Sequence, residues 1–174
     1  MFKKILVLIA VPFWAFALNL SLQNGEIKAH TEIFGDSAIN PSSTKISADL
    51  VMEDTPESIK GEISILGADL TSDNAKRDEH MYETLNVSTQ PKISFTIESI
   101  RLGEEKYIIS GKLSLNGVTK EVKAMSSIDQ NESSVAMKGM FYIKMSDYGI
   151  EPPTLLFLKV RDQVDLNFDL NFTR

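Results

Sequence analysis

The segment VDLNFDLNF, residues 164–172, carries the pattern that decides the fold. Its apolar residues occupy every second position, and Asp or Asn fills each position between them. Successive side chains of a β-strand point to opposite faces, so this alternation predicts a strand with one apolar face and one solvated face. Strands of this kind are typical of antiparallel sheets.

The same two-residue period recurs along most of the preceding chain. Seven further runs show it, at about residues 26–33, 45–52, 59–65, 93–98, 107–115, 118–124 and 135–145. The pair Asn116-Gly117 predicts a type I′ hairpin turn, because both central positions of that turn need a positive φ. Eight strands with short polar turns predict an antiparallel barrel or a sandwich. The barrel is favoured because long edge strands of a sandwich would need protection.

The first residues form a separate unit that is typical of a cleaved export signal. Lys3 and Lys4 precede a short apolar run, and Ala15-Phe16-Ala17 supplies the small residues of a cleavage site. The run is shorter than the roughly 20 residues that a membrane-spanning helix needs. We therefore expect a signal peptide at residues 1–17 and one domain at residues 18–174, located in the periplasm or secreted, without stable membrane insertion.

The chain is acidic and contains no cysteine. It has 18 Lys and Arg and 24 Asp and Glu, so that removal of Lys3 and Lys4 leaves 16 basic and 24 acidic residues. An acidic chain without a basic cluster does not hold phosphate backbones, which argues against nucleic acid as a partner. The lack of cysteine excludes thiol nucleophiles. The sequence leaves open whether the chain forms a homodimer.

The stretch DLTSDNAKRDEHMYETL, residues 69–85, interrupts the alternation. Asp73 is placed to cap a helix from about Asn74 to Leu85, which would cross between the third and fourth strands. His80 and Asp78 would point to different sides of that helix, so they do not form a catalytic pair. His80 would share a metal with one glutamate at most, whereas zinc needs three or four ligands. We expect a solvated helix here, with no catalytic residue and no metal.

The inward phase of the strands is strongly apolar. Eight strands enclose a lumen that is either filled by side chains or holds one small ligand, and the sequence leaves both alternatives open. Gly61, Gly111 and Gly139 share this phase; we favour local curvature as their role over keeping the lumen free. The apolar residues from which a ligand site is predicted are Ile63, Ile65, Phe95, Ile97, Leu113, Leu115, Phe141, Ile143, Leu166 and Phe168.

Several motifs resemble those of the YceI-like family. KRDEHM (residues 76–81) followed by PKISF (91–95) is similar to a paired motif of that family, and GKLSLNGVTKEV (111–122) is similar to its hairpin. SDYGI (146–150) and VRDQVDLNFDL (160–170) resemble its later elements. The resemblance begins near Ile59. The segment before it lacks the family's opening motif, which predicts a different arrangement of the first two strands.

This resemblance implies an exported bacterial protein with a lipocalin-like, eight-stranded antiparallel barrel around an elongated apolar cavity. Members of the family hold polyprenyl chains, isoprenoid quinones or fatty-acid derivatives, and no enzymatic activity is established for them. The implied ligand is thus a long-chain isoprenoid or fatty amphiphile, with no other cofactor. The resemblance adds Arg77, Asp78, His80 and Tyr148 to the expected ligand-binding residues, and the first three would either hold the crossover segment in place or lie near the cavity.

Two other functions are left open by the sequence. A lipid-modifying enzyme would need polar side chains directed into the lumen, for which the candidates are Arg77, Asp78, His80, Lys120 and Tyr148. A filled barrel would instead act as a structural or signalling module through its surface. Its partner surface would be EPPTLLFL, residues 151–158, although we favour a loop packed across one barrel end for that segment.

Overall fold

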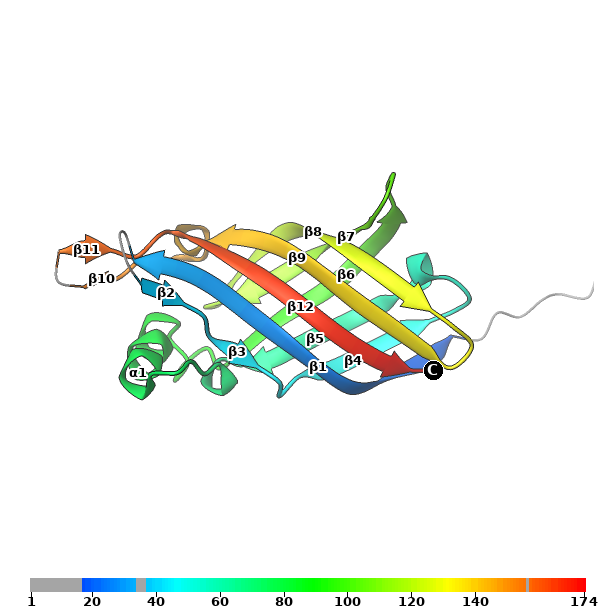
Figure 1. Cartoon of the computed structure of the whole chain (residues 1–174), viewed down its shortest axis with the longest axis horizontal. Helices are drawn as coiled ribbons and strands as arrows, with labels where there is room; N and C mark the ends of the chain where they lie inside the picture. The colour runs from blue at the N-terminus through cyan, green and yellow to red at the C-terminus, as the bar shows by residue number, and fades with distance from the viewer. Residues whose placement is uncertain (1–16, 34–36, 156) are drawn as a thin grey trace, which may run out of the picture.

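The computed structural model describes residues 17–33, 37–155 and 157–174. The signal peptide expected at residues 1–17 lies almost entirely outside this part of the chain. The strands form an elongated, inclined barrel, with helix α1 (Ala75–Thr84) at one end and the C-terminus at the other (Figure 1). Among the described residues, no helix has the length and apolar character needed to span a membrane.

Eight antiparallel strands close the barrel in chain order. They are β1 (Leu18–Ile33), β4 (Ser47–Met52), β5 (Lys60–Leu66), β6 (Lys92–Leu102), β7 (Tyr107–Leu115), β8 (Val118–Gln130), β9 (Ser134–Lys144) and β12 (Gln163–Thr173). β1 pairs with β4 through residues 18–20 and with β12 through residues 21–30, so the first strand closes the ring. The predicted eight-stranded antiparallel barrel with one helix is confirmed.

Short elements complete the two ends of the barrel. β2 (Ser37–Ile39) and β3 (Ser42–Ser43) pair with β1, and β10 (Thr154–Leu155) pairs with β11 (Leu158–Lys159). Three 3-10 turns, η1 (Pro56–Ser58), η2 (Gly67–Asp69) and η3 (Met145–Tyr148), connect larger elements. The predicted turn between β7 and β8 is confirmed, since Asn116 and Gly117 both have positive φ, 50° and 72°.

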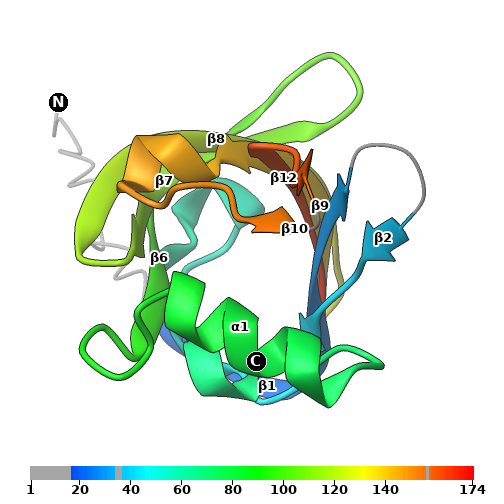
Figure 2. The same ribbon diagram turned by 90° about the vertical axis from the view of Figure 1, so that its left-hand side faces the viewer.

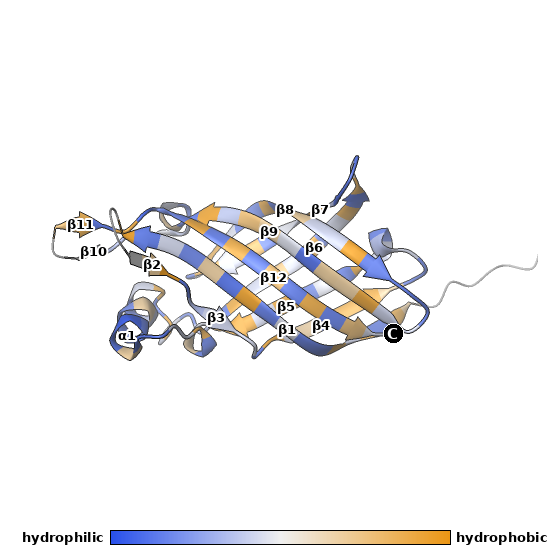
Figure 3. Cartoon of the chain, viewed as in Figure 1, coloured by the Kyte–Doolittle hydropathy of each residue, from blue (hydrophilic) through white to orange (hydrophobic). Residues whose placement is uncertain are grey.

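Apolar and polar bands alternate along the strands (Figure 3), and the inward glycines each meet a close neighbour. Gly61 has a φ of 126°, and a side chain there would collide with the carbonyl oxygen of Asp49, which agrees with a role in local curvature. A side chain at Gly111 would collide with the carbonyl oxygen of Thr96 and with the Phe95 ring, and one at Gly139 with the Phe168 ring and the carbonyl oxygen of Met125. These two glycines therefore let aromatic rings lie against the barrel wall.

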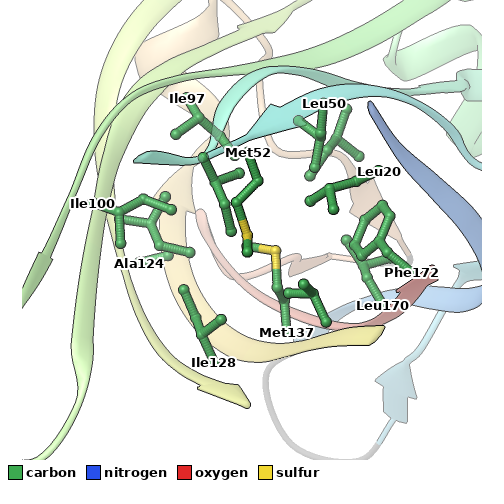
Figure 4. Close-up of a cluster of buried hydrophobic side chains, with 14 residues drawn as sticks. Leu20, Leu50, Met52, Ile97, Ile100, Ala124, Ile128, Met137, Leu170 and Phe172 are labelled. Carbon is green, nitrogen blue, oxygen red and sulfur yellow. The ribbon is translucent and has the colours of Figure 1, made fainter. Parts of the chain in front are cut away.

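The end of the barrel near the C-terminus is filled by an apolar core. η1 packs against β6 and β4 across this end, and the Met52 and Met137 side chains point toward one another in the middle of the lumen (Figure 4). The other buried members lie on the surrounding strands and on the η1 loop. They include Leu20, Leu50, Ile59, Ile100, Ile128, Val135 and Phe172, each at most 7% exposed. We call this region the solid half.

Candidate functional site

The other half of the barrel, next to α1, encloses an apolar cavity of about 660 Å³. Ile109, Met137 and Leu170, each 1% exposed, line its inner end and also belong to the core of the solid half. This volume lies within the range of about 300–1,000 Å³ that is usual for small-molecule sites. The barrel therefore combines the two alternatives left open by the sequence, since one half is filled and the other, the hollow half, is not.

Twelve of the fourteen predicted binding residues line the cavity. They are Ile63, Ile65, Arg77, His80, Phe95, Ile97, Leu113, Leu115, Phe141, Ile143, Leu166 and Phe168. The inward phase of the strands thus identified ten side chains that line the cavity, and the resemblance added Arg77 and His80. That these side chains bind a ligand stays a prediction.

Two aromatic rings narrow the cavity along its length. The rings of Phe95 and Phe141 stack with centroids 6.3 Å apart and an interplanar angle of 28°. Because β7 and β8 separate β6 from β9 in the sheet, this contact reaches across the lumen. The cavity continues past the pair to Ile109 and Met137. A ligand tail that reached the inner end would have to pass these rings.

Asp78 does not line the cavity, contrary to the sequence-based expectation. Its side chain accepts hydrogen bonds from the backbone N–H of Ser72 (3.0 Å) and from the Ser72 hydroxyl (2.6 Å), and the residue is only 7% exposed. On the same face of α1, the Tyr82 hydroxyl donates a hydrogen bond to the carbonyl oxygen of Leu70 (2.7 Å). These contacts fix the helix to the preceding loop. The expected solvated helix is therefore wrong on this face.

Tyr148 is also placed outside the cavity. Pairing of β8 with β9 ends at Met125 and Met140, and beyond that point both strands border a second hollow, lined by Lys120 and Tyr148 among others. Tyr148 is 1% exposed, and its hydroxyl has no hydrogen-bond partner among the described residues. Burial, with a smaller contribution from Asp147, raises the pKa of Tyr148 to about 12, so the phenol is neutral at ordinary pH.

The polar residues that an enzyme would need are not brought together. Arg77 and His80 lie at the cavity, whereas Asp78 accepts hydrogen bonds from Ser72. Lys120 and Tyr148 line the second hollow, between β8 and β9. The His80 ring lies 3.5 Å from the Glu83 carboxylate, and both side chains are exposed. Across the described ranges, no three His, Cys, Asp or Glu side chains are grouped as metal ligands.

Helix α1 forms one side of the cavity mouth, opposite β10 and η3 (Figure 2). Arg77, Met81 and Leu85, which follow one another at intervals of four residues along the helix, line the cavity. The predicted cap was one residue off: Asn74, not Asp73, caps the helix, and its side-chain oxygen accepts the Arg77 N–H at 3.1 Å. Asp73 precedes the cap and lies 3.5 Å from the Arg77 guanidinium.

Sequence reasoning missed three groups of lining residues. Inward side chains visible in the alternating pattern were not assigned to the site: Ile27, Ala29, Thr31 and Ile33 of β1, and Ile93, Ile109, Ala124, Met137, Val164 and Leu170 of later strands. The second group comes from short elements and loops, where alternation gives no signal: Ile39, Leu70, Ile150, Pro153 and Val160 among others. The third group, which includes Lys76, Met81 and Glu83, lies on α1. Pro153 and Thr154 line the cavity, so this part of the segment 151–158 packs at the barrel end as the favoured interpretation expected, whereas Phe157 is 99% exposed.

An eight-stranded antiparallel barrel with one hollow half is a lipocalin-like ligand-binding architecture. The model of the YceI-like domain family matches residues 20–172, and the chain belongs to this family. The match includes the first two strands, so the expectation that the resemblance begins near Ile59 was too narrow. The different arrangement expected for these strands is not seen, since β1 and β4 are neighbours in the closed ring.

Individual proteins support the same fold. A UPF0312 protein of Pectobacterium carotovorum is 38% identical over 73 residues, which are 41% of this chain and 38% of that protein. Alignments with the curated relatives cover about 38 to 56% of their lengths. The crystal structure of Burkholderia cenocepacia BcnA matches 84% of this chain and 95% of its own, with a TM-score of 0.74 and 19% identity.

A second solved structure is described as a polyisoprenoid binding domain from Saccharophagus degradans, implicated in plant cell wall breakdown. It matches 88% of this chain and 97% of its own, with a TM-score of 0.67. At 13% identity, this likeness shows that the two proteins share a fold.

Proposed function

We propose that this protein is an exported binding protein that sequesters or carries one long-chain amphiphile in its cavity. The observation that carries the proposal is the hollow half itself, an apolar space of about 660 Å³ that ends on a solid core. The likeness of the fold to a polyisoprenoid binding domain supports an isoprenoid as ligand, and an isoprenoid quinone or a fatty-acid derivative would suit the same apolar space.

The free energy of binding would come mainly from the tail. Transfer of each CH₂ group from water to an apolar site contributes roughly 0.8 kcal/mol, so about ten such groups contribute about 8 kcal/mol before the entropic costs of binding. The strand side chains that line the cavity are almost all apolar and offer such an environment. These apolar side chains would therefore be enough to bind a water-insoluble chain.

Export is supported by the position of the first strand. β1 begins at Leu18, the residue that follows the expected cleavage site after Ala17. Removal of residues 1–17 would leave every described strand of the barrel intact. The protein would then act in the periplasm or outside the cell, where a hydrophobic molecule needs a carrier to cross water.

The proposal is tested by purifying the protein from the periplasm without detergent and identifying bound lipids by native mass spectrometry and extraction. We expect one long-chain species at about one per chain, because the apolar cavity of about 660 Å³ ends on a solid core. The Val164→Phe variant, which places a ring in the cavity, is the control and should retain less lipid. An empty wild-type protein that also fails to bind added polyprenols, quinones and fatty amides would contradict the carrier function.

A further inference from the structure

The charged residues of the cavity lining all come from one helix. Among the lining residues, Lys76, Arg77, His80 and Glu83 of α1 are the ionisable ones, and the strands contribute apolar and a few uncharged polar side chains. α1 lies at the mouth, whereas the inner end is formed by Ile109, Met137 and Leu170. An amphiphile would therefore be oriented with its polar head at α1 and its tail toward the solid half.

The charge on this lining is positive, although the whole chain has a net charge of −6. Lys76 and Arg77 outnumber Glu83 even when His80 is neutral. Asp78, the acid that follows Arg77 in the sequence, is directed to Ser72 instead of the cavity. The fold thus separates two cations from the nearest acid in sequence and presents the cations at the mouth.

Arg77 has the geometry of a residue that can take a further partner. Its side chain is 29% exposed, and among the described residues its carboxylate neighbour is Asp73, at 3.5 Å and 91% exposed. A long ion pair with so exposed a partner contributes little, because water and salt screen it. The planar guanidinium matches carboxylate and phosphate groups through two parallel hydrogen bonds.

The turn of helix that carries these cations is held in place. The Asn74 side chain accepts the Arg77 N–H at 3.1 Å, and Asp78 binds both the backbone and the hydroxyl of Ser72. Ser42 and Thr71 exchange two backbone hydrogen bonds, of 2.9 and 3.0 Å, which tie the loop before α1 to β3. Lys76 and Arg77 therefore stand on a positioned backbone, which lowers the entropic cost of binding a head group.

We propose that the ligand carries an anionic head, a carboxylate or a phosphate, which Arg77 and Lys76 bind at the mouth while the tail occupies the cavity. This inference rests on the proposed carrier function and adds to it the class of the head group. His80 and Thr84, which also line this rim, would lie beside the head.

The test compares ligands that share a tail and differ in their heads. Hexadecyl and geranylgeranyl chains would each be offered as alcohol, carboxylate, monophosphate and amine, below their micelle concentrations, to lipid-free protein. We expect an anionic head to bind about tenfold more tightly than the alcohol, the size of one charge-assisted hydrogen-bonded contact, and the amine to bind no better than the alcohol. Preference between carboxylate and phosphate identifies the head.

Substitutions then locate the effect. Arg77→Gln and Lys76→Gln should reduce the affinity for the anionic ligand by more than the affinity for the alcohol. Lys106→Gln, the same charge change in the turn between β6 and β7 at the opposite end, should change neither affinity. Equal affinity for alcohol and anion would overturn the inference and leave the carrier function standing. An equal loss of affinity for alcohol and anion in Arg77→Gln would also overturn it. If no ligand bound to the wild-type protein, both this inference and the carrier function would be contradicted.

Discussion

The solid and hollow halves of this barrel are built from the same eight strands with the same alternation, yet they differ in what fills them. In the solid half, long side chains such as Met52 and Met137 reach the centre from opposite walls, and η1 covers the end. In the hollow half, the Phe168 ring lies over Gly139, against the wall, and the Phe95 ring packs over Gly111 and against Phe141 without filling the space around the pair. The comparison teaches that the direction of inward side chains decides whether an apolar lumen is core or cavity.

The ends of the two halves differ in the same way. The solid half ends on η1, whose Pro56 is buried. The hollow half ends on α1 and, on the opposite side of the mouth, on η3 and β10 (Figure 2). Dense packing in one half supplies stability, and the unfilled space in the other would supply binding. The following predictions test this division, beginning with the largest expected effect.

Truncation of an aromatic ring should cost more stability in the solid half than in the hollow half. Phe172 and Phe168 both point inward from β12, and Phe172 is 1% exposed in the core, whereas Phe168 borders the cavity. We expect Phe172→Ala to lower the free energy of unfolding by about 3–5 kcal/mol and Phe168→Ala by about 1–2 kcal/mol, because a ring beside a void has fewer contacts to lose. Urea denaturation measures both, and equal losses would contradict the comparison.

Enlargement of a side chain should have the opposite distribution of effects. Val135 is fully buried in the solid half, and Val164 lines the cavity. Val135→Phe should lower the free energy of unfolding by about 1–3 kcal/mol through overpacking, and Val164→Phe by less than about 1 kcal/mol. Val164→Phe alone should reduce lipid binding. If Val164→Phe proved as destabilising as Val135→Phe, the cavity would lack the room assigned to it.

The hollow between β8 and β9 offers a test at Tyr148, whose buried hydroxyl lacks a partner among the described residues. Tyr148→Phe should raise the free energy of unfolding by about 1 kcal/mol at neutral pH, since it removes an unsatisfied polar group.

The same residue predicts a dependence on alkaline pH. Burial raises the pKa of Tyr148 to about 12, from a usual value of 10.0, so between these values the phenol ionises only in the unfolded chain. The wild type should therefore lose roughly 2 kcal/mol relative to Tyr148→Phe as the pH rises from about 10 to 12. Denaturation curves that shift in parallel for the two proteins over this range would show that Tyr148 does not titrate as inferred.

The smallest effect concerns α1, which covers the hollow half without belonging to the barrel. Asn74→Ala should destabilise the helix by about 1 kcal/mol through loss of its cap, while Asp73→Ala should have little effect. Hydrogen exchange should show faster exchange of α1 amides in Asn74→Ala alone. The exchange rates of amides in the solid half should be unchanged, because β12 and β9 do not depend on the helix for their pairing. A larger effect of Asp73→Ala would restore Asp73 as the cap.

Much of the fold followed from local pattern. Alternation predicted the eight strands, and the pair Asn116-Gly117 predicted one turn. The interruption at residues 69–85 predicted the helix to within about a residue at each end. The cap was misplaced by one residue because Asp and Asn are both good caps, and the choice depends on the backbone conformation of the loop. Asp78 and Tyr148 were misplaced because sequence does not show which face of a helix or turn meets the barrel.

By itself, the sequence determined the antiparallel barrel and the side chains that face its lumen, because the two-residue period of a strand is a local property of the backbone. Only the tertiary structure decided that one half is filled and the other is hollow. That outcome depends on rotamers and contacts across the lumen, between strands far apart in the chain. It also brought Lys76 and Arg77 to the cavity mouth and turned Asp78 away, since only the packing of α1 sets which of its faces meets the cavity.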